Sequence, residues 1–148
     1  MKFLVFDTET SGLPGNSKFP AEYVNNWPHI VQLSWGIYNS DGEELKFYDF
    51  IIKPDGFKID EDSIKIHRIT DEIANREGHN IKDVLYIFKN SLKTVNNIVA
   101  HNFEFDFKVL GAECIRNKIK LNRKSIRKMI CTMKSTTKYC NIPSPFYN

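Results

Sequence analysis

Cysteine is scarce in this 148-residue chain, and its pattern excludes two common roles. The three cysteines, Cys114, Cys131 and Cys140, are odd in number and form no Cys-x-x-Cys pair. A disulfide framework usually needs an even set, and a structural zinc site usually needs closely spaced ligands. We therefore expect three reduced, partly buried thiols and no structural zinc.

Long apolar runs are missing as well. No stretch approaches the roughly 20 apolar residues that span a bilayer, and Met1-Lys2 leads into a predicted strand instead of a signal peptide. These absences predict a cytoplasmic protein without a membrane partner. The chain is 41% hydrophobic and 13% aromatic, which is enough for a single globular domain over residues 1–148.

Charge is unevenly distributed along the chain. Residues 107–148 contain ten Lys or Arg and one acid, whereas residues 1–106 contain 11 basic and 17 acidic residues, so the net charge is +3. A basic segment beside an acidic one suits a metal-dependent enzyme that acts on a polyanion, because Lys and Arg neutralise phosphates. The alternative is a solvated basic helix face with no partner.

The hydrophobic pattern predicts an α/β fold. Three antiparallel-type strands come first, and helix, strand and helix follow, which favours a mixed sheet with helices packed on it. The predicted strands are 2–6, 30–38, 45–52, 98–100 and 129–131, with a hairpin turn over Asn39–Gly42. The predicted helices are 60–66, 81–92 and 103–117, with Asn102 as the cap of the last, a helical turn from Thr132, and a long loop over 12–28.

Two carboxylates end the first predicted strand. Side chains alternate along a strand, so Asp7 and Glu9 point to the same face. Two such charges roughly 5–6 Å apart repel by about 3 kcal/mol near a protein surface, and a divalent cation would relieve this repulsion. The alternative is an ordinary strand that ends in a solvated acidic pair.

A second group of polar residues follows the short strand 98–100. Asp106 falls in the first turn of the next helix, where the helix dipole favours a carboxylate. If strand 98–100 lies beside the first strand, Asp106 can face Asp7 and Glu9. Taken alone, Asp106 could simply stabilise its helix, and His101 could be a core residue.

Four ordered segments resemble a known family. They are Asp7-Thr8-Glu9-Thr10-Ser11-Gly12-Leu13, His67-x-Ile69-Thr70, His101-Asn102-x-x-Phe105-Asp106 and Cys131-Thr132-Met133. In order and spacing they resemble the DEDD superfamily of 3′–5′ exonucleases, most of all the proofreading (epsilon) subunits of bacterial DNA polymerase III. This resemblance covers nearly the whole chain.

The resemblance implies a ribonuclease H-like fold, with a mixed five-stranded sheet flanked by helices, and two-metal hydrolysis at the 3′ end of DNA or RNA. It implies that Asp7 bridges two metals, that Glu9 binds one, and that Asp106 binds the other directly or through water. Magnesium or manganese suits such a carboxylate site better than zinc does. A single strand would be the substrate, and a DNA polymerase is a possible partner.

The resemblance also implies four substrate contacts. Thr10 would contact the terminal nucleotide through its backbone, and Leu13 would act as an apolar wedge. Phe105 would pack against the terminal sugar or base, and His67 would meet a substrate oxygen. Leu13 and Phe105 could instead be core residues, and Arg68 stands where relatives often have glycine.

One family motif is missing. Relatives have a His followed five positions later by a fourth carboxylate, but no His follows His101 in this chain. We therefore expect a domain truncated at its C-terminus, without its usual general base, and with weak or no activity alone. The alternative function is a catalytically incomplete nucleic-acid-binding or polymerase-associated module of the same fold.

Overall fold

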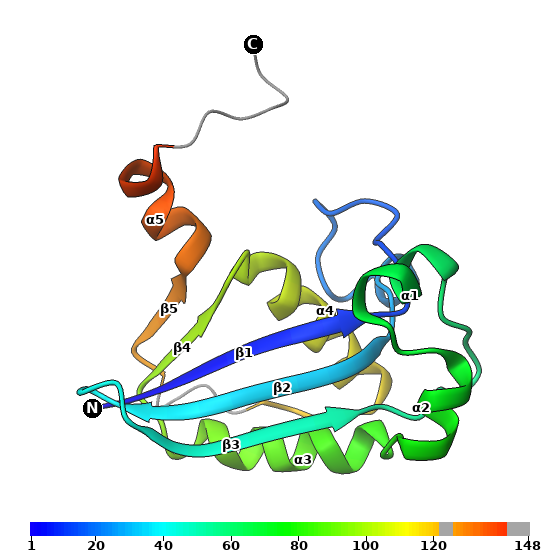
Figure 1. Cartoon of the computed structure of the whole chain (residues 1–148), viewed down its shortest axis with the longest axis horizontal. Helices are drawn as coiled ribbons and strands as arrows, with labels where there is room; N and C mark the ends of the chain where they lie inside the picture. Colours follow the sequence, from blue (N-terminus) through cyan, green and yellow to red (C-terminus); the bar gives the residue numbers. More distant parts are fainter. Residues whose placement is uncertain (122–125, 142–148) are drawn as a thin grey trace.

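The computed structural model describes residues 1–121 and 126–141, which form a five-stranded mixed sheet. The strand order is β3-β2-β1-β4-β5 (Figure 1). β1 pairs antiparallel with β2, which pairs antiparallel with β3, whereas β4 pairs parallel with both β1 and β5. The predicted ribonuclease H-like sheet flanked by helices is confirmed. The strands are β1 (Lys2–Thr10), β2 (Ile30–Asn39), β3 (Glu44–Ile51), β4 (Asn97–Ala100) and β5 (Lys128–Cys131).

The described residues also form five α-helices and one 3₁₀ turn, of which all but the last helix lie between strands in the chain. They are η1 (Val24–Asn26), α1 (Glu61–His67), α2 (Asp71–Glu77), α3 (Ile81–Leu92), α4 (Phe103–Arg116) and α5 (Thr132–Cys140). The predicted helix 81–92 has the same bounds as α3. Helix α2 was not predicted. Its start is capped by Thr70, whose side-chain oxygen accepts a hydrogen bond from the Ile73 amide.

The core lies between one face of the sheet and the helices α3 and α4. Leu4 and Phe6 of β1 point into it, and Phe6 packs edge to face against Phe88 of α3 and Phe103 of α4. The buried indole of Trp35 donates a hydrogen bond to Ser91 of α3. No described helix is long and apolar enough to cross a membrane.

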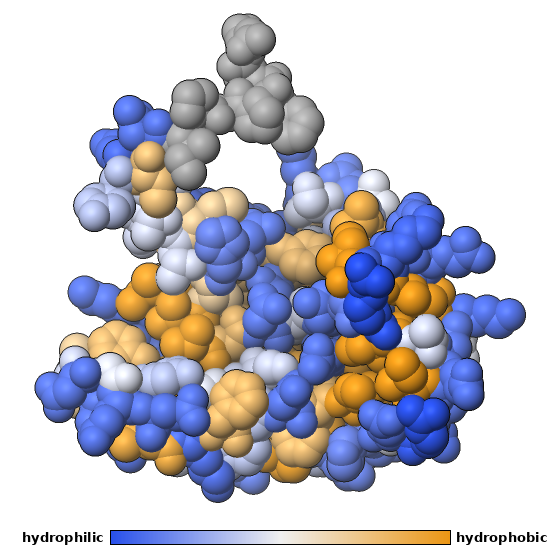
Figure 2. Space-filling model, viewed as in Figure 1, coloured by the Kyte–Doolittle hydropathy of each residue, from blue (hydrophilic) through white to orange (hydrophobic). Residues whose placement is uncertain are grey.

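The other face of β1 is open. In Figure 1 the strands lie in front of α4, and Figure 2 shows apolar and hydrophilic residues mixed over this side of the molecule. Val5, on the same face as Asp7 and Glu9, is 40% exposed. The two carboxylates therefore project from a sheet face that leaves room for a substrate.

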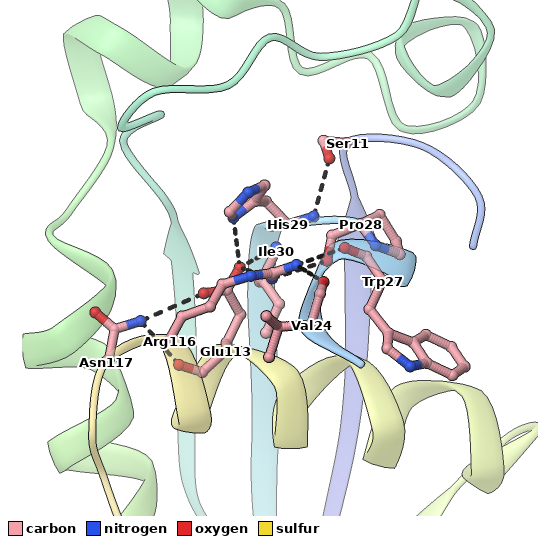
Figure 3. A network of polar contacts seen from close by, with 9 residues as sticks. All are labelled: Ser11, Val24, Trp27, Pro28, His29, Ile30, Glu113, Arg116 and Asn117. Carbon is pink, nitrogen blue, oxygen red and sulfur yellow. Dashed lines mark hydrogen bonds and ion pairs between the residues drawn. The ribbon is translucent and has the colours of Figure 1, made fainter. Parts of the chain in front are cut away.

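A buried polar network ties the loop between β1 and β2 to α4 (Figure 3). The Glu113 carboxylate, 3% exposed, contacts His29 Nδ1 at 2.9 Å and the Arg116 guanidinium at 2.9 Å. Arg116 also donates to the carbonyl oxygens of Val24, Trp27 and Pro28. The loop is anchored at its start, since the His29 amide donates to Ser11 Oγ at 3.0 Å.

Two expectations from the sequence are corrected by the structure. Asn102 occupies the N-cap position of α4 but adopts a left-handed conformation (φ 56°) and makes no side-chain cap hydrogen bond. All three cysteines are free, as expected, but Cys140 is exposed instead of partly buried. Burial raises the pKa of the Cys114 thiol to about 12.

Candidate functional site

Asp7 and Glu9 lie within β1, which runs four residues further than the predicted strand 2–6. Both belong to the open face, and their cross-strand partners on β2 are Ser34 and Gln32. Within the described residues, neither carboxylate has a hydrogen bond or ion pair, so both are available to a ligand. The prediction that they share one face is consistent with the alternating burial of the strand.

Asp106 is brought to β1 by the first turn of α4. Its Oδ1 accepts hydrogen bonds from the Thr8 amide at 3.1 Å and from Thr8 Oγ1 at 2.7 Å. The pairing of β1 with β4 ends at Val5, so the Thr8 amide lies beyond the last strand partner and the carboxylate takes that partner's place. Asp106 is 3% exposed and stands beside the residue that separates Asp7 from Glu9.

The three carboxylates affect one another. Burial raises the pKa of Asp7, which the charge of His101 partly offsets. Burial and then the charge of Asp7 raise the pKa of Glu9, while His67 lowers it. Burial raises the pKa of Asp106 to about 6, although the Thr8 hydrogen bonds act in the opposite direction. A site whose acids all resist ionisation is electrostatically suited to a cation.

The raised pKa of Asp106 predicts a pH-dependent stability of the metal-free protein. Between its ordinary value of 3.8 and about 6, folded Asp106 holds a proton that the unfolded chain has lost. Stability therefore falls as pH rises through this window. Compared with Asp106→Asn in chelator, the wild type should lose about 1–2 kcal/mol of unfolding free energy between about pH 4 and pH 7. Urea unfolding measures this difference, and a difference independent of pH would contradict the prediction.

His67 presents a buried donor near Glu9. Its Nδ1 accepts the Ile69 amide at 3.1 Å, so in the neutral ring the proton resides on Nε2. Nε2 is buried and has no hydrogen-bond partner among the described residues. A buried N–H without a partner is costly, so this atom is able to donate a hydrogen bond to an added acceptor.

The ring of His101 is hydrogen-bonded differently from that of His67, because its Nδ1 contacts a hydroxyl group instead of a backbone amide. The Thr132 hydroxyl contacts the Ala100 carbonyl oxygen at 3.4 Å and His101 Nδ1 at 3.1 Å. If the hydroxyl proton goes to the carbonyl, Thr132 accepts from Nδ1–H, and His101 Nε2 then keeps a free lone pair. His101 is exposed and close enough to lower the pKa of Asp7, so it is not the core residue considered above.

The other three predicted substrate contacts, Thr10, Leu13 and Phe105, differ in exposure. Leu13 is 85% exposed, which excludes the core alternative for this residue. Thr10 is buried, and its hydroxyl donates to the Gly12 carbonyl at 2.8 Å. The Asp60 amide donates to the Ser11 carbonyl oxygen at 2.9 Å, which holds this turn against the start of α1. Phe105 is partly buried and meets Trp27 edge to face.

The donor set fits a hard divalent cation in chemistry. Asp7, Glu9 and Asp106 supply carboxylate oxygens, the ligands that magnesium and manganese prefer. In residues 1–121 and 126–141, no three His, Cys, Asp or Glu side chains converge closely enough to hold an ion in the present geometry. Besides burial, the charge of Asp7 raises the pKa of both Glu9 and Asp106, so the three carboxylates interact electrostatically. They are nevertheless too far apart to share one ion, and cation binding would need their side chains to move closer together.

Sequence reasoning missed one residue that builds the site. Thr8 holds Asp106 through two hydrogen bonds, although 98 residues separate the two in sequence. The sequence indicated this role only through the position of Thr8 between Asp7 and Glu9. Because side chains alternate along a strand, Thr8 points to the opposite face, toward α4.

Solved structures of exonuclease I share this fold. The E. coli enzyme with a dT13 oligonucleotide has a TM-score of 0.77 and 19% identity, covering 99% of this chain and 31% of that one. A zinc-bound E. coli exonuclease I complex with single-stranded DNA has a TM-score of 0.73 and 22% identity, covering 95% and 29%. A complex of exonuclease I with SSB-Ct has a TM-score of 0.77 and 18% identity, covering 99% and 31%. The chain thus spans about a third of the length of these proteins.

The sequence itself identifies the family. No curated protein matches the chain significantly. A family model described as exonuclease (RNase_T) matches residues 4–143, and this match confirms the predicted likeness to the DEDD exonucleases at the level of the family. The chain therefore belongs to the RNase_T exonuclease family.

Proposed function

We propose that this protein is a metal-dependent 3′–5′ exonuclease acting on single-stranded DNA or RNA. One observation carries the proposal: two carboxylates of β1 without partners among the described residues lie beside a buried carboxylate of α4 whose pKa is raised to about 6. Such a group of acids is unfavourable alone and favourable around divalent cations. The exonuclease family and the fold shared with exonuclease I support it.

Asp7, Glu9 and Asp106 would hold two magnesium or manganese ions. When bound, these ions would supply Lewis-acid activation of water and neutralise charge at the leaving 3′ oxygen. Asp106 is the most firmly positioned of the three, because Thr8 fixes one of its oxygens. His67 would donate its Nε2 proton to an oxygen of the terminal nucleotide, and Leu13 would contact the base from its exposed turn.

Of the two imidazoles at the site, His101 is the better proton acceptor. The Ile69 amide occupies the lone pair of His67 Nδ1, so the remaining nitrogen of His67 is a donor. His101 Nε2 has a free lone pair when Thr132 accepts from Nδ1. Among the described residues, this arrangement favours His101 over His67 as the group that would accept a proton from the attacking water.

The basic segment after residue 106 supports a polyanionic substrate, although not all of its ten Lys and Arg residues count toward phosphate binding in the described structure. Lys108 pairs with Glu104 at 2.7 Å, and Arg116 belongs to the buried network, so neither is free for phosphate. Arg123 and Lys124 lie outside the described residues. The other six, Lys118, Lys120, Arg127, Lys128, Lys134 and Lys138, carry the excess positive charge.

A second candidate is a nucleic-acid-binding or polymerase-associated module of the same fold. The observation that favours it is that, in residues 1–121 and 126–141, no three potential metal ligands converge closely enough to hold an ion. A role in proofreading, replication or repair, with a DNA polymerase as partner, belongs to the first proposal, the exonuclease.

The test uses single strands of DNA and RNA, each labelled at the 3′ or the 5′ end, with Mg²⁺ or Mn²⁺. We expect labelled mononucleotides from 3′-labelled strands, progressive shortening of 5′-labelled strands, and no reaction in chelator. Release from the 5′ end would overturn the direction, and metal-dependent binding without cleavage would favour the binding module.

A further inference from the structure

Polar side chains continue from the candidate site across the open face of the sheet. Asp7 on β1 is paired with Ser34 on β2, which is paired with Asp49 on β3. Glu9 on β1 is paired with Gln32 on β2. β1, β2 and β3 lie side by side in Figure 1, so Asp49 stands two strands away from the carboxylates, on the same face.

Ser34 and Gln32 are potential competitors for these carboxylates. Directly opposed residues on one face have Cβ atoms about 4.5–5.5 Å apart, which is within hydrogen-bonding reach of a Ser hydroxyl or a Gln amide. A carboxylate that accepts such a donor has fewer lone pairs for a cation. The neighbours of Asp7 and Glu9 would therefore be expected to occupy them.

Asp49 removes this competition. Its Oδ1 accepts the Ser34 hydroxyl at 2.6 Å and the Gln32 amide nitrogen at 2.7 Å. A hydroxyl has a single proton, so Ser34 has none left for Asp7. The Gln32 amide nitrogen directs one of its two protons to Asp49 on β3. Both carboxylates of β1 consequently have no partner in the described residues.

We propose that Asp49 is a positioning residue that keeps Asp7 and Glu9 free by holding the donors of Ser34 and Gln32. The inference rests on the proposed function, in which Asp7 and Glu9 bind a divalent cation. Asp49 itself does not touch the ion. Its role is to accept the hydrogen bonds of the Ser34 hydroxyl and the Gln32 amide, so that these groups do not donate to Asp7 and Glu9.

The test is Mn²⁺ titration of the folded protein by calorimetry, without substrate. Asp49→Ala should bind Mn²⁺ on the order of tenfold more weakly, because the released donors turn to Asp7 and Glu9. Adding Ser34→Ala and Gln32→Met to Asp49→Ala removes the donors and should restore affinity to within about twofold of the wild type. A purely structural role for Asp49 would not give this rescue.

The Asp49→Asn variant separates hydrogen bonding from charge. Asparagine keeps an oxygen in the place of Oδ1 but loses the negative charge, so this variant should retain most of the Mn²⁺ affinity. Equal losses in Asp49→Asn and Asp49→Ala, or no rescue in the triple variant, would overturn the inference. If Asp49→Ala does not fold, Asp49→Val replaces it, because valine favours strands and also lacks an acceptor, and it should show the same loss of Mn²⁺ affinity.

The same titration distinguishes this inference from the proposed function. If the wild type and Asp7→Ala bind Mn²⁺ equally, the metal site itself is wrong and the proposed function fails. If Asp7→Ala weakens binding but Asp49→Ala does not, the site stands and only the role of Asp49 is rejected. Thermal unfolding of each variant confirms that the compared proteins are folded.

Discussion

Replacing Asp7 by Asn is expected to reduce the release of nucleotides from a 3′ end on the order of 100-fold or more. The physical reason is the loss of a charged oxygen ligand; even a group that only hydrogen-bonds a metal ligand is worth about 10–100-fold in affinity or activity. The amide keeps the shape of the side chain, so packing on β1 is unchanged. The rate is measured on a 3′-labelled single strand at saturating Mn²⁺.

The matched control is Asp41→Asn, which removes one negative charge from the exposed hairpin turn at the far end of β2. It should leave the rate within about twofold, since exposed charges beyond a Debye length of about 8–10 Å are screened. Equal rates in the wild type and in Asp7→Asn would reject the assignment of Asp7. Equal losses in both variants would show that general charge, and not a specific ligand, controls the rate.

The local part of the fold was predictable because it rests on short-range periodicity. The alternation along β1 places Asp7 and Glu9 on one face, and the 3.6-residue period of α3 fixes its bounds at Ile81–Leu92. Asp106 falls in the first turn of α4, as its distance from the short strand indicated. These features depend only on residues that are close together in the sequence.

The family resemblance predicted the sheet, but the individual tertiary contacts were not predictable, because their partners are far apart in sequence. Thr8 and Asp106 meet only because β4 ends and α4 begins beside β1. The contact of His29 with Glu113 spans 84 residues. The short helix α2 also escaped detection, since in seven residues it buries only Ala74 and shows no clear apolar stripe.

Replacing Glu113 by Ala is expected to lower the free energy of unfolding by about 3–5 kcal/mol, because it leaves a mostly buried guanidinium without its counter-charge. Glu113 also accepts from the Ile30 amide and from Asn117, and these donors lose their acceptor as well. For a chain of this size, such a loss lowers Tm by roughly 10 °C or more. Thermal and urea unfolding measure it, with Glu61→Ala on exposed α1 as the control that should change stability by less than about 0.5 kcal/mol.

A second variant combines Glu113→Leu with Arg116→Met. It distinguishes the contribution of the Glu113–Arg116 ion pair to stability from that of the other hydrogen bonds of Arg116. Replacing a buried ion pair by apolar residues is often nearly neutral. Here stability should not recover, because Arg116 also donates to the carbonyl oxygens of Val24, Trp27 and Pro28, which would then lack donors. We therefore expect the double variant to remain at least about 2 kcal/mol less stable than the wild type. Full recovery would show that the ion pair alone holds the loop, and that its carbonyl contacts contribute little.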